Sequence, residues 1–220
     1  MKKQIKAVLF DMDGLVLDTE KLYSRFWQEA AIALGYPMTR EQALGMRSLN
    51  RDAGEAKLQS YFGKEVSYTK IRDKRIELMD AFIEKEGVYI KPGIHELLDF
   101  LQENGIKTAI ATSSPLDRTI KYLSSVNLVD RFDKLISGYM VEKGKPEPDI
   151  YLFAAKELGL EPKNCLVLED SPAGILAAYR AGCMPVMIPD LDQPDKKTRE
   201  LLFAKVDGLA NVIDFISANQ

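Results

Sequence analysis

The apolar positions of this chain follow two periods, and the first informative pattern is a short unbroken run. Residues 5–10 are apolar apart from one lysine, and Asp11, Asp13 and Gly14 follow at once. A short apolar run that ends in such a turn is typical of a strand buried on both faces of a sheet. Comparable runs predict four further strands, at residues 108–112, 134–136, 165–168 and 185–188.

Segments of helical periodicity lie between the later strands. Apolar residues recur there at spacings of three and four, and Pro, Gly, Asn or Ser mark the ends. The predicted helices cover residues 94–101, a segment that begins at 115, residues 149–158 and residues 172–181, and Ser171 is the predicted N-cap of the last one. Strands that alternate with helices build parallel sheets from βαβ units, so the sequence predicts an α/β fold.

Residues 20–88 are different, because they show three helical patterns and no convincing strand. The patterns fall at about residues 22–34, 49–62 and 71–86. The chain therefore leaves the sheet after its first strand and returns near residue 90. We expect a core formed by residues 1–16 and 90–220, with a helical insertion at residues 17–89.

Composition limits the classes of function that the chain can have. A length of 220 residues and a hydrophobic content of 46% allow a sizeable core. The net charge of −3 leaves no basic face for nucleic acid, and neither a signal-peptide pattern nor a membrane-length apolar run is present. Cys165 and Cys183 stand in apolar settings that are typical of buried free thiols. We expect a cytoplasmic monomer without nucleic-acid or membrane partners.

Polar side chains follow four of the predicted strands, and the carboxyl ends of parallel strands meet at one edge of a sheet. In chain order these side chains are Asp11 and Asp13, then Thr112, Ser113 and Ser114, then Lys145, then Glu169 and Asp170. Packed carboxylates raise one another's pKa unless a cation neutralises them, and hard oxygen ligands select Mg²⁺. Hydroxyls before a helix and a lysine suit a phosphate group, so the set points to phosphoryl transfer with an aspartate nucleophile.

Four segments, taken in order, resemble the signature motifs of the haloacid dehalogenase-like hydrolase superfamily. They are DMDGLVLDTE at residues 11–20, ATSS at 111–114, GKPEPD at 144–149 and LEDSPAGI at 168–175. The resemblance covers essentially the whole chain, and the helical insertion is similar to the small cap of that superfamily. The most similar branch holds the β-phosphoglucomutase-like proteins and the phosphosugar phosphatases. The resemblance implies a Rossmann-like, doubly wound parallel sheet core with an inserted α-helical cap domain.

The resemblance also implies a role for each motif residue. Asp11 would be the nucleophile, and Asp13 would be the acid and base of the reaction. Mg²⁺ would be held by Asp11, by the backbone carbonyl of Asp13 and by Asp170, with Glu169 as a ligand directly or through a water.

Other residues would bind the substrate. Thr112, the backbone of Ser113 and Lys145 would hold the phosphoryl oxygens. The cap would set specificity, with Arg47 as the preferred contact and Arg51 as the reserve. Ser114 is interpreted as a helix cap rather than a phosphate ligand.

The expected activity is Mg²⁺-dependent hydrolysis of a small phosphorylated metabolite, a sugar phosphate by preference. A β-phosphoglucomutase-type phosphomutase is the alternative. The mutases carry a histidine near the position of Tyr23, and this departure disfavours the mutase without excluding it. Dehalogenation is disfavoured because dehalogenases generally lack the acid that Asp13 supplies. A non-enzymatic binding module is disfavoured because every catalytic position is filled.

Overall fold

The computed structural model describes residues 4–47, 49, 51–190 and 193–219. These residues fall into two compact units. One unit joins Met1–Leu17 to Tyr89–Gln220, and the other is Asp18–Val88. From the sequence we propose that the insertion spans residues 17–89.

The larger unit contains one parallel sheet, whose described strands run in the order β3-β2-β1-β4-β5-β6. The strands are β1 Ala7–Phe10, β2 Lys107–Thr112, β3 Lys134–Ser137, β4 Cys165–Glu169, β5 Met184–Met187 and β6 Ala204–Lys205. This order is that of a doubly wound, Rossmann-like fold, so the predicted fold class is confirmed. The short strand β6 was missed because two residues carry no readable period.

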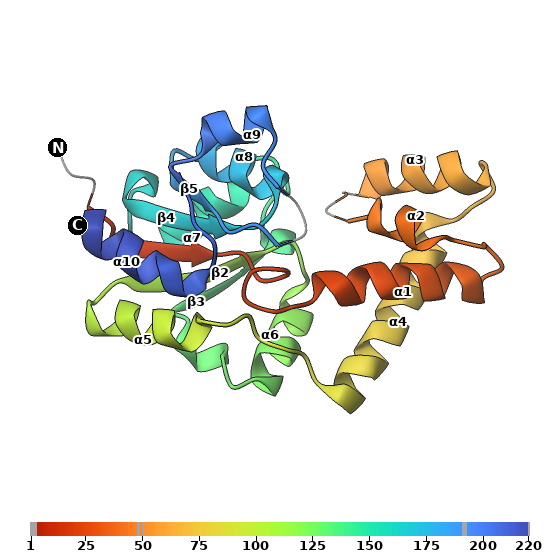
Figure 1. Ribbon diagram of the computed structural model, residues 1–220, viewed down its shortest axis with the longest axis horizontal. Helices are drawn as coiled ribbons and strands as arrows, with labels where there is room; N and C mark the ends of the chain where they lie inside the picture. The colour runs from red at the N-terminus through yellow and green to blue at the C-terminus, as the bar shows by residue number, and fades with distance from the viewer. Residues whose placement is uncertain (1–3, 48, 50, 191–192, 220) are drawn as a thin grey trace. The chain divides into compact units, whose positions relative to one another are not determined.

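Helices cover both faces of the sheet (Figure 1). Helices α7 (Asp149–Glu157) and α8 (Pro172–Arg180) lie on one face. Helices α5 (Ile94–Glu103) and α10 (Leu209–Asn219) pack together on the other face. The unit also contains α6 (Leu116–Ser125), α9 (Lys196–Leu201) and the 3₁₀ turns η1 (Val129–Arg131), η2 (Gly138–Met140) and η3 (Pro162–Asn164).

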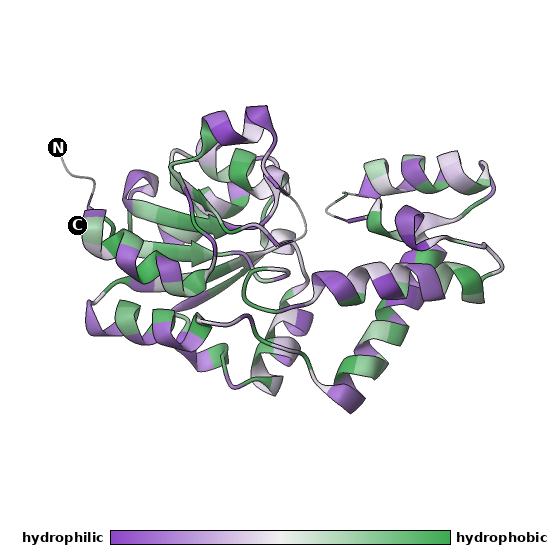
Figure 2. Ribbon diagram, viewed as in Figure 1, coloured by the Kyte–Doolittle hydropathy of each residue, from purple (hydrophilic) through white to green (hydrophobic). Residues whose placement is uncertain are grey.

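The central strands are buried on both sides, as their apolar runs predict. Leu9 of β1 and Val167 of β4 belong to the cluster formed with α7 and α8. Successive strand residues point to opposite faces, and Phe10 stacks edge-to-face on Phe132 with ring centroids 5.5 Å apart. In Figure 2 the central strands are mostly hydrophobic, and the helices carry both hydrophobic and hydrophilic residues. The sheet is therefore the middle layer of a three-layer core.

The smaller unit is a cluster of four described helices. They are α1 Glu20–Ala33, α2 Arg40–Leu44, α3 Arg51–Phe62 and α4 Tyr68–Glu86. Trp27 is buried in the core of this unit, with its ring 5.6 Å from that of Tyr68. Helix α2 was not predicted; its five residues are too few for a period, and the capping box between Thr39 and Gln42 stabilises its start. Among the helices of the described residues, none is both long and apolar enough to span a bilayer.

We predict that Leu9→Ala lowers the free energy of unfolding by about 2–5 kcal/mol, because removing a fully buried leucine side chain leaves a cavity. Leu152 on α7 is 42% exposed and provides the matched control. Leu152→Ala should change the same quantity by less than about 1 kcal/mol. Urea unfolding followed by circular dichroism measures both variants. Equal losses in the two variants would contradict the packing described for β1.

Candidate active site

The candidate site lies at the carboxyl ends of β1, β2 and β4. The strand order changes direction at β1, because β2 lies on one side of it and β4 on the other. Ligands of open α/β sheets bind at such a switch point. Asp11 follows β1 directly, and its N–H donates to the carbonyl of Leu168 at 3.0 Å. The hydrogen-bond ladder between β1 and β4 therefore extends to the first acidic residue of the site.

A tight turn follows and fixes the second acidic residue. Gly14 has φ of 87°, a left-handed conformation that glycine adopts without strain. Its N–H donates to the carbonyl of Leu17 at 2.8 Å, and the N–H of Leu17 donates to the carbonyl of Met12 at 2.9 Å. Met12 is fully buried. The turn thus anchors the backbone of Asp13 to the core.

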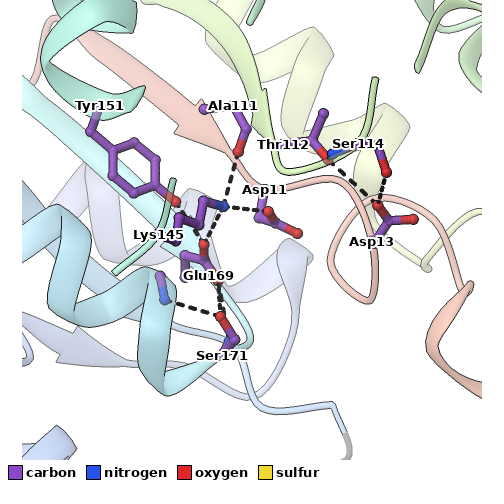
Figure 3. Close-up of polar contacts among 10 residues, drawn as sticks. Asp11, Asp13, Ala111, Thr112, Ser114, Lys145, Tyr151, Glu169 and Ser171 are labelled. Atoms are coloured by element: carbon purple, nitrogen blue, oxygen red, sulfur yellow. Dashed lines mark hydrogen bonds and ion pairs between the residues drawn. The ribbon is translucent and has the colours of Figure 1, made fainter. Parts of the chain in front are cut away.

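Lys145 reaches the same sheet edge from the loop before α7, as Figure 3 shows. Its ammonium donates to Oδ1 of Asp11 at 2.5 Å and to Oε1 of Glu169 at 2.6 Å. It also donates to the carbonyl of Ala111, at the end of β2, at 3.0 Å. The lysine side chain is only 7% exposed. One ammonium therefore joins residues from β1, β2 and β4.

Glu169 is fully buried and accepts hydrogen bonds on both carboxylate oxygens. Oε1 accepts from Lys145 and from the hydroxyl of Tyr151, the latter at 2.7 Å. Oε2 accepts from the N–H of Ser171 at 3.2 Å and from its hydroxyl at 2.9 Å. Ser171 also caps α8 by accepting from the N–H of Gly174, as its predicted role as a helix cap requires. The carboxylate therefore lies beside the positive end of the α8 dipole, which favours it.

The electrostatics of the site follow from this burial. Burial raises the pKa of the Asp11 carboxyl to about 7; Lys145 opposes the rise, while Glu169 and Asp13 add to it. Burial would lower the pKa of Lys145, but Asp11 and Glu169 outweigh it and hold that pKa well above its usual value. Burial and then Glu169 raise the pKa of Tyr151 well above its usual value, so its hydroxyl remains a donor. The carboxylates outnumber the ammonium, and a further cation would lower the pKa of Asp11.

Asp13 has a separate set of partners. The hydroxyl of Ser114 donates to its Oδ2 at 2.9 Å, and that of Thr112 reaches the same oxygen at 3.4 Å. The expectation that Ser114 caps the next helix is wrong: the N-cap of α6 is Pro115, and no side chain caps that helix. The hydroxyl of Ser114 serves instead as a donor to a carboxylate, and such a charge-assisted hydrogen bond is stronger than a neutral one. The two hydroxyls hold this side chain apart from the Lys145 network.

A group of three buried carboxylates fits a metal ion. Oxygen atoms of Asp11, Glu169 and Asp170 lie within 4.8 Å of one another. Carboxylate oxygens are the ligands that Mg²⁺ prefers. The raised pKa of Asp11 reports the repulsion and desolvation that a divalent cation would relieve. The residues present therefore fit the predicted cofactor.

The structure brings most of the predicted site residues to this edge of the sheet. They are Asp11, Lys145, Glu169 and Asp170 in one cluster, and Asp13 with Thr112 in another. Ser113 follows Thr112 and is exposed. Arg47 belongs to the Asp18–Val88 unit, where its Nε donates to the carbonyl of Leu44 at 3.0 Å.

Two partners of Glu169 were missed from the sequence. Tyr151 falls on the apolar face of a predicted helix, so its period indicates only a core residue. Ser171 was recognised as a helix cap but not as a donor to the carboxylate. Its position two residues after Glu169, before a proline, is the one signal that could have suggested this second role.

Comparison with known proteins agrees with this geometry. The model of the haloacid dehalogenase-like hydrolase family matches residues 5–182. The chain belongs to this family. It is accordingly an enzyme of the hydrolase class.

This haloacid dehalogenase-like hydrolase has relatives of more than one named activity. It is 33% identical over 178 residues to the Phosphorylated carbohydrates phosphatase of Thermotoga maritima, covering 81% of this chain and 82% of that protein. It is 30% identical over 190 residues to the β-phosphoglucomutase of Bacillus subtilis, covering 83% and 82%. The structure of CbbY from Rhodobacter sphaeroides in complex with phosphate matches with a TM-score of 0.78 and 26% identity, covering 95% of this chain and 96% of that one.

We predict that Gly174→Ala destabilises this hydrolase, because a Cβ at that position would overlap the Glu169 carboxylate. Relief requires the carboxylate or the start of α8 to move, and overpacking of this kind costs about 1–3 kcal/mol. Gly208→Ala is the control, since its Cβ would meet only Oδ1 of Asn211 at 3.6 Å. Thermal unfolding measures both variants. A Gly174→Ala protein as stable as Gly208→Ala would contradict the close packing of Glu169 on α8.

Proposed function

We propose that this hydrolase is a Mg²⁺-dependent phosphatase that acts on a small phosphorylated carbohydrate through an aspartyl-phosphate on Asp11. The observation that carries the proposal is the ammonium of Lys145 bound to the Asp11 carboxylate at the switch point of the sheet. A nucleophilic carboxylate and an ammonium that can hold phosphoryl oxygens are then in direct contact. Phosphoryl transfer needs this combination of positioning and charge.

In the first half-reaction, an oxygen of Asp11 attacks phosphorus and the ester bond to the sugar oxygen breaks. Asp13 gives its proton to that leaving oxygen, so that a neutral alcohol departs. Ser114 supports this role, because its hydroxyl donates to Oδ2 of Asp13 at 2.9 Å and fixes the direction of that carboxyl group. The product is free sugar and a phosphoryl group bonded to Asp11.

In the second half-reaction, water attacks the same phosphorus. Asp13, now a carboxylate, takes a proton from that water. The bond between phosphorus and the Asp11 oxygen breaks, which releases inorganic phosphate and restores the carboxylate. The two aspartates therefore return to their starting protonation states after one turnover.

Lys145, Thr112 and the backbone of Ser113 would hold the oxygens of the phosphoryl group. When Asp11 turns to attack phosphorus, its hydrogen bond from Lys145 breaks. That N–H of the ammonium can then donate to a phosphoryl oxygen. The bonds of Lys145 to Ala111 and Glu169 keep the ammonium in place during this exchange. Fixed donors stabilise developing charge without reorganising at the moment of reaction.

Asp11, Asp170, the backbone carbonyl of Asp13 and, directly or through a water, Glu169 would hold Mg²⁺. Bound there, the ion would neutralise the charge of the carboxylates and of the phosphate together. The buried group of three carboxylates supports this assignment. Positive charge at this position would also favour the ionised form of Asp11, the form in which it is a nucleophile.

The class of substrate is proposed from the relatives. The T. maritima protein is named for phosphorylated carbohydrates, and it matches over four-fifths of this chain. The β-phosphoglucomutase of B. subtilis, at 30% identity, favours the phosphomutase as the second candidate. Near the position where the mutases carry a histidine lies Tyr23, whose ring is 4.6 Å from the guanidinium carbon of Arg75. A phenol that packs against a guanidinium is a poor proton shuttle, so we place hydrolysis first.

We predict that the protein releases phosphate from sugar phosphates with Mg²⁺ and that EDTA abolishes the release. Asp11→Asn should reduce the rate to background, because the amide is not a nucleophile. Asp13→Ala should lower kcat by about 100- to 10,000-fold through loss of acid–base catalysis. Asp207→Asn, at a side chain that is 92% exposed, should retain the wild-type rate. A malachite-green assay over a panel of phosphorylated metabolites measures all of these rates.

Three outcomes would redirect or contradict the proposal. Formation of glucose 6-phosphate from β-glucose 1-phosphate, primed by a bisphosphate and faster than phosphate release, would assign the mutase instead. Release that persists in EDTA at the wild-type rate would contradict the metal. Absence of both products over the whole panel would contradict both activities.

We further propose Arg47 as the cap residue that contacts the substrate. It lies between α2 and α3, and Arg51, the reserve, is the exposed first residue of α3. Arg47→Ala should raise KM for the best sugar phosphate about tenfold through loss of a charge-assisted hydrogen bond, with kcat nearly unchanged. KM for p-nitrophenyl phosphate, which lacks a sugar, should not change. The same effect in Arg51→Ala and not in Arg47→Ala would transfer the role to Arg51.

A further inference from the structure

Tyr151 contacts both members of the ion pair at the centre of the site. Its hydroxyl donates to Oε1 of Glu169 at 2.7 Å, and Lys145 donates to the same oxygen. The ammonium of Lys145 also lies 5.1 Å from the centroid of the tyrosine ring. Figure 3 shows the hydroxyl directed at the carboxylate rather than at Asp11. Tyr151 is therefore an aromatic residue that takes part in the polar network of the site.

The hydroxyl of Tyr151 is not needed to fill space. The residue is fully buried in the apolar cluster between α7 and the sheet, among Ala111, Ala154 and Ala155. A phenylalanine would fill the same volume without a polar atom. Burying a hydroxyl costs free energy unless a partner compensates for it, and here the described partner is Glu169. What the oxygen adds to the site is thus the bond to the carboxylate.

That bond constrains the carboxylate from a third direction. Ser171 holds Oε2 from the start of α8, and Lys145 approaches Oε1 from the loop before α7. Tyr151 lies in the first turn of α7, where its N–H donates to the carbonyl of Pro148. With donors on both oxygens and two on Oε1, the plane of the Glu169 carboxylate is fixed. Glu169, which anchors the ammonium of Lys145, is thus held by groups in α7 and at the start of α8, and it shares the rigidity of those helices.

Rigidity of this anchor matters when Lys145 changes partners. In the proposed reaction, the ammonium exchanges Asp11 for a phosphoryl oxygen while it keeps Ala111 and Glu169. If Oε1 of Glu169 had only the lysine as a donor, the carboxylate would attract the ammonium more strongly and could rotate with it. The hydroxyl of Tyr151, as a second donor to Oε1, satisfies part of the hydrogen-bonding capacity of that oxygen and so weakens its pull on the ammonium.

We propose that Tyr151 is a positioning residue that acts through Glu169 to hold the ammonium of Lys145 toward the transferring phosphoryl group. This inference rests on the proposed function, since it concerns the same site. It assigns to this tyrosine a role in transition-state binding rather than in core packing alone.

The test compares Tyr151→Phe with a matched variant that also removes a buried hydroxyl near a carboxylate. Thr108→Val is that control. Thr108 lies at the end of β2 that is opposite to the candidate site, and its Oγ1 is 3.4 Å from Oδ2 of Asp133. Two quantities are measured in MgCl₂. One is kcat/KM for p-nitrophenyl phosphate, and the other is the Kd of orthovanadate, a mimic of the five-coordinate transition state, by titration calorimetry.

Tyr151→Phe should lower kcat/KM about 10- to 100-fold, the usual range for loss of an outer-shell partner. The Kd of orthovanadate should rise by a similar factor, since a mimic of the transition state reports the same lost interaction. Irreversibly inactive protein lowers the stoichiometry and leaves the Kd unchanged, and reversible unfolding of half the sample would raise the apparent Kd only about twofold. A partly unfolded sample therefore cannot imitate the expected rise. Thr108→Val should change each quantity by less than about twofold, whatever its cost in stability.

A double variant tests the route through the lysine. If Tyr151 acts through Glu169 on Lys145, adding Tyr151→Phe to Lys145→Ala should raise the Kd of orthovanadate by less than about twofold further. Additive losses would contradict that route. A Tyr151→Phe protein with wild-type Kd and a lower melting temperature would reduce the tyrosine to a core residue.

The failures of the two proposals are distinguishable. Absence of hydrolysis by the wild-type protein over the whole panel contradicts the proposed function. The calorimetric comparison needs no turnover, so it still decides the positioning role. Hydrolysis by the wild type together with an unchanged Tyr151→Phe variant overturns the inference alone.

Discussion

One buried ammonium, that of Lys145, lies between two buried carboxylates and joins three strands of the sheet. Desolvation alone would favour the protonated form of Asp11 over its carboxylate. Lys145 opposes this rise in the pKa of Asp11, yet it supplies one positive charge against the two negative charges of Asp11 and Glu169. Burial, the largest cause, together with the negative charges of Glu169 and Asp13, outweighs Lys145 and raises the pKa of Asp11 to about 7. The site is therefore organised so that a further cation completes it rather than disturbs it.

The backbone makes this charge arrangement rigid. The N–H of Asp11 donates to β4, and Lys145 donates to the carbonyl of Ala111 at the end of β2. Both contacts depend on the parallel register that places Phe10 beside Ile110 and Leu168. A shift of one residue in either strand would turn the acidic residues to another face. The buried apolar runs that set the register thus also set the geometry of the chemistry.

Much of this could be predicted from the sequence, for identifiable reasons. Runs such as residues 165–168 are continuous and apolar, and the rule that parallel strands present their ends at one edge brought Asp11, Lys145 and Glu169 together. Local side-chain choices were less accessible. The hydroxyl of Ser114 could accept from an N–H at the start of α6 or donate to the carboxylate of Asp13, and neither spacing nor residue type reveals which of these it does. Helix α10 does carry a readable stripe, at Leu209, Val212 and Ile216, which was overlooked.

The hydrogen bonds that Glu169 already accepts bear on whether it can also bind a metal directly, which the motif alone does not decide. A carboxylate has about four acceptor sites, and this one already accepts from Lys145, Tyr151 and two groups of Ser171. Direct ligation of a metal would displace at least one of these donors and loosen the anchor of the ammonium. A bridging water would donate one hydrogen bond to the carboxylate in place of a direct bond to the metal, so it would compete less strongly with the present donors. Of the two alternatives that the motif permits for Glu169, the hydrogen bonds favour the indirect one, which lets the same residue support the metal and the lysine together.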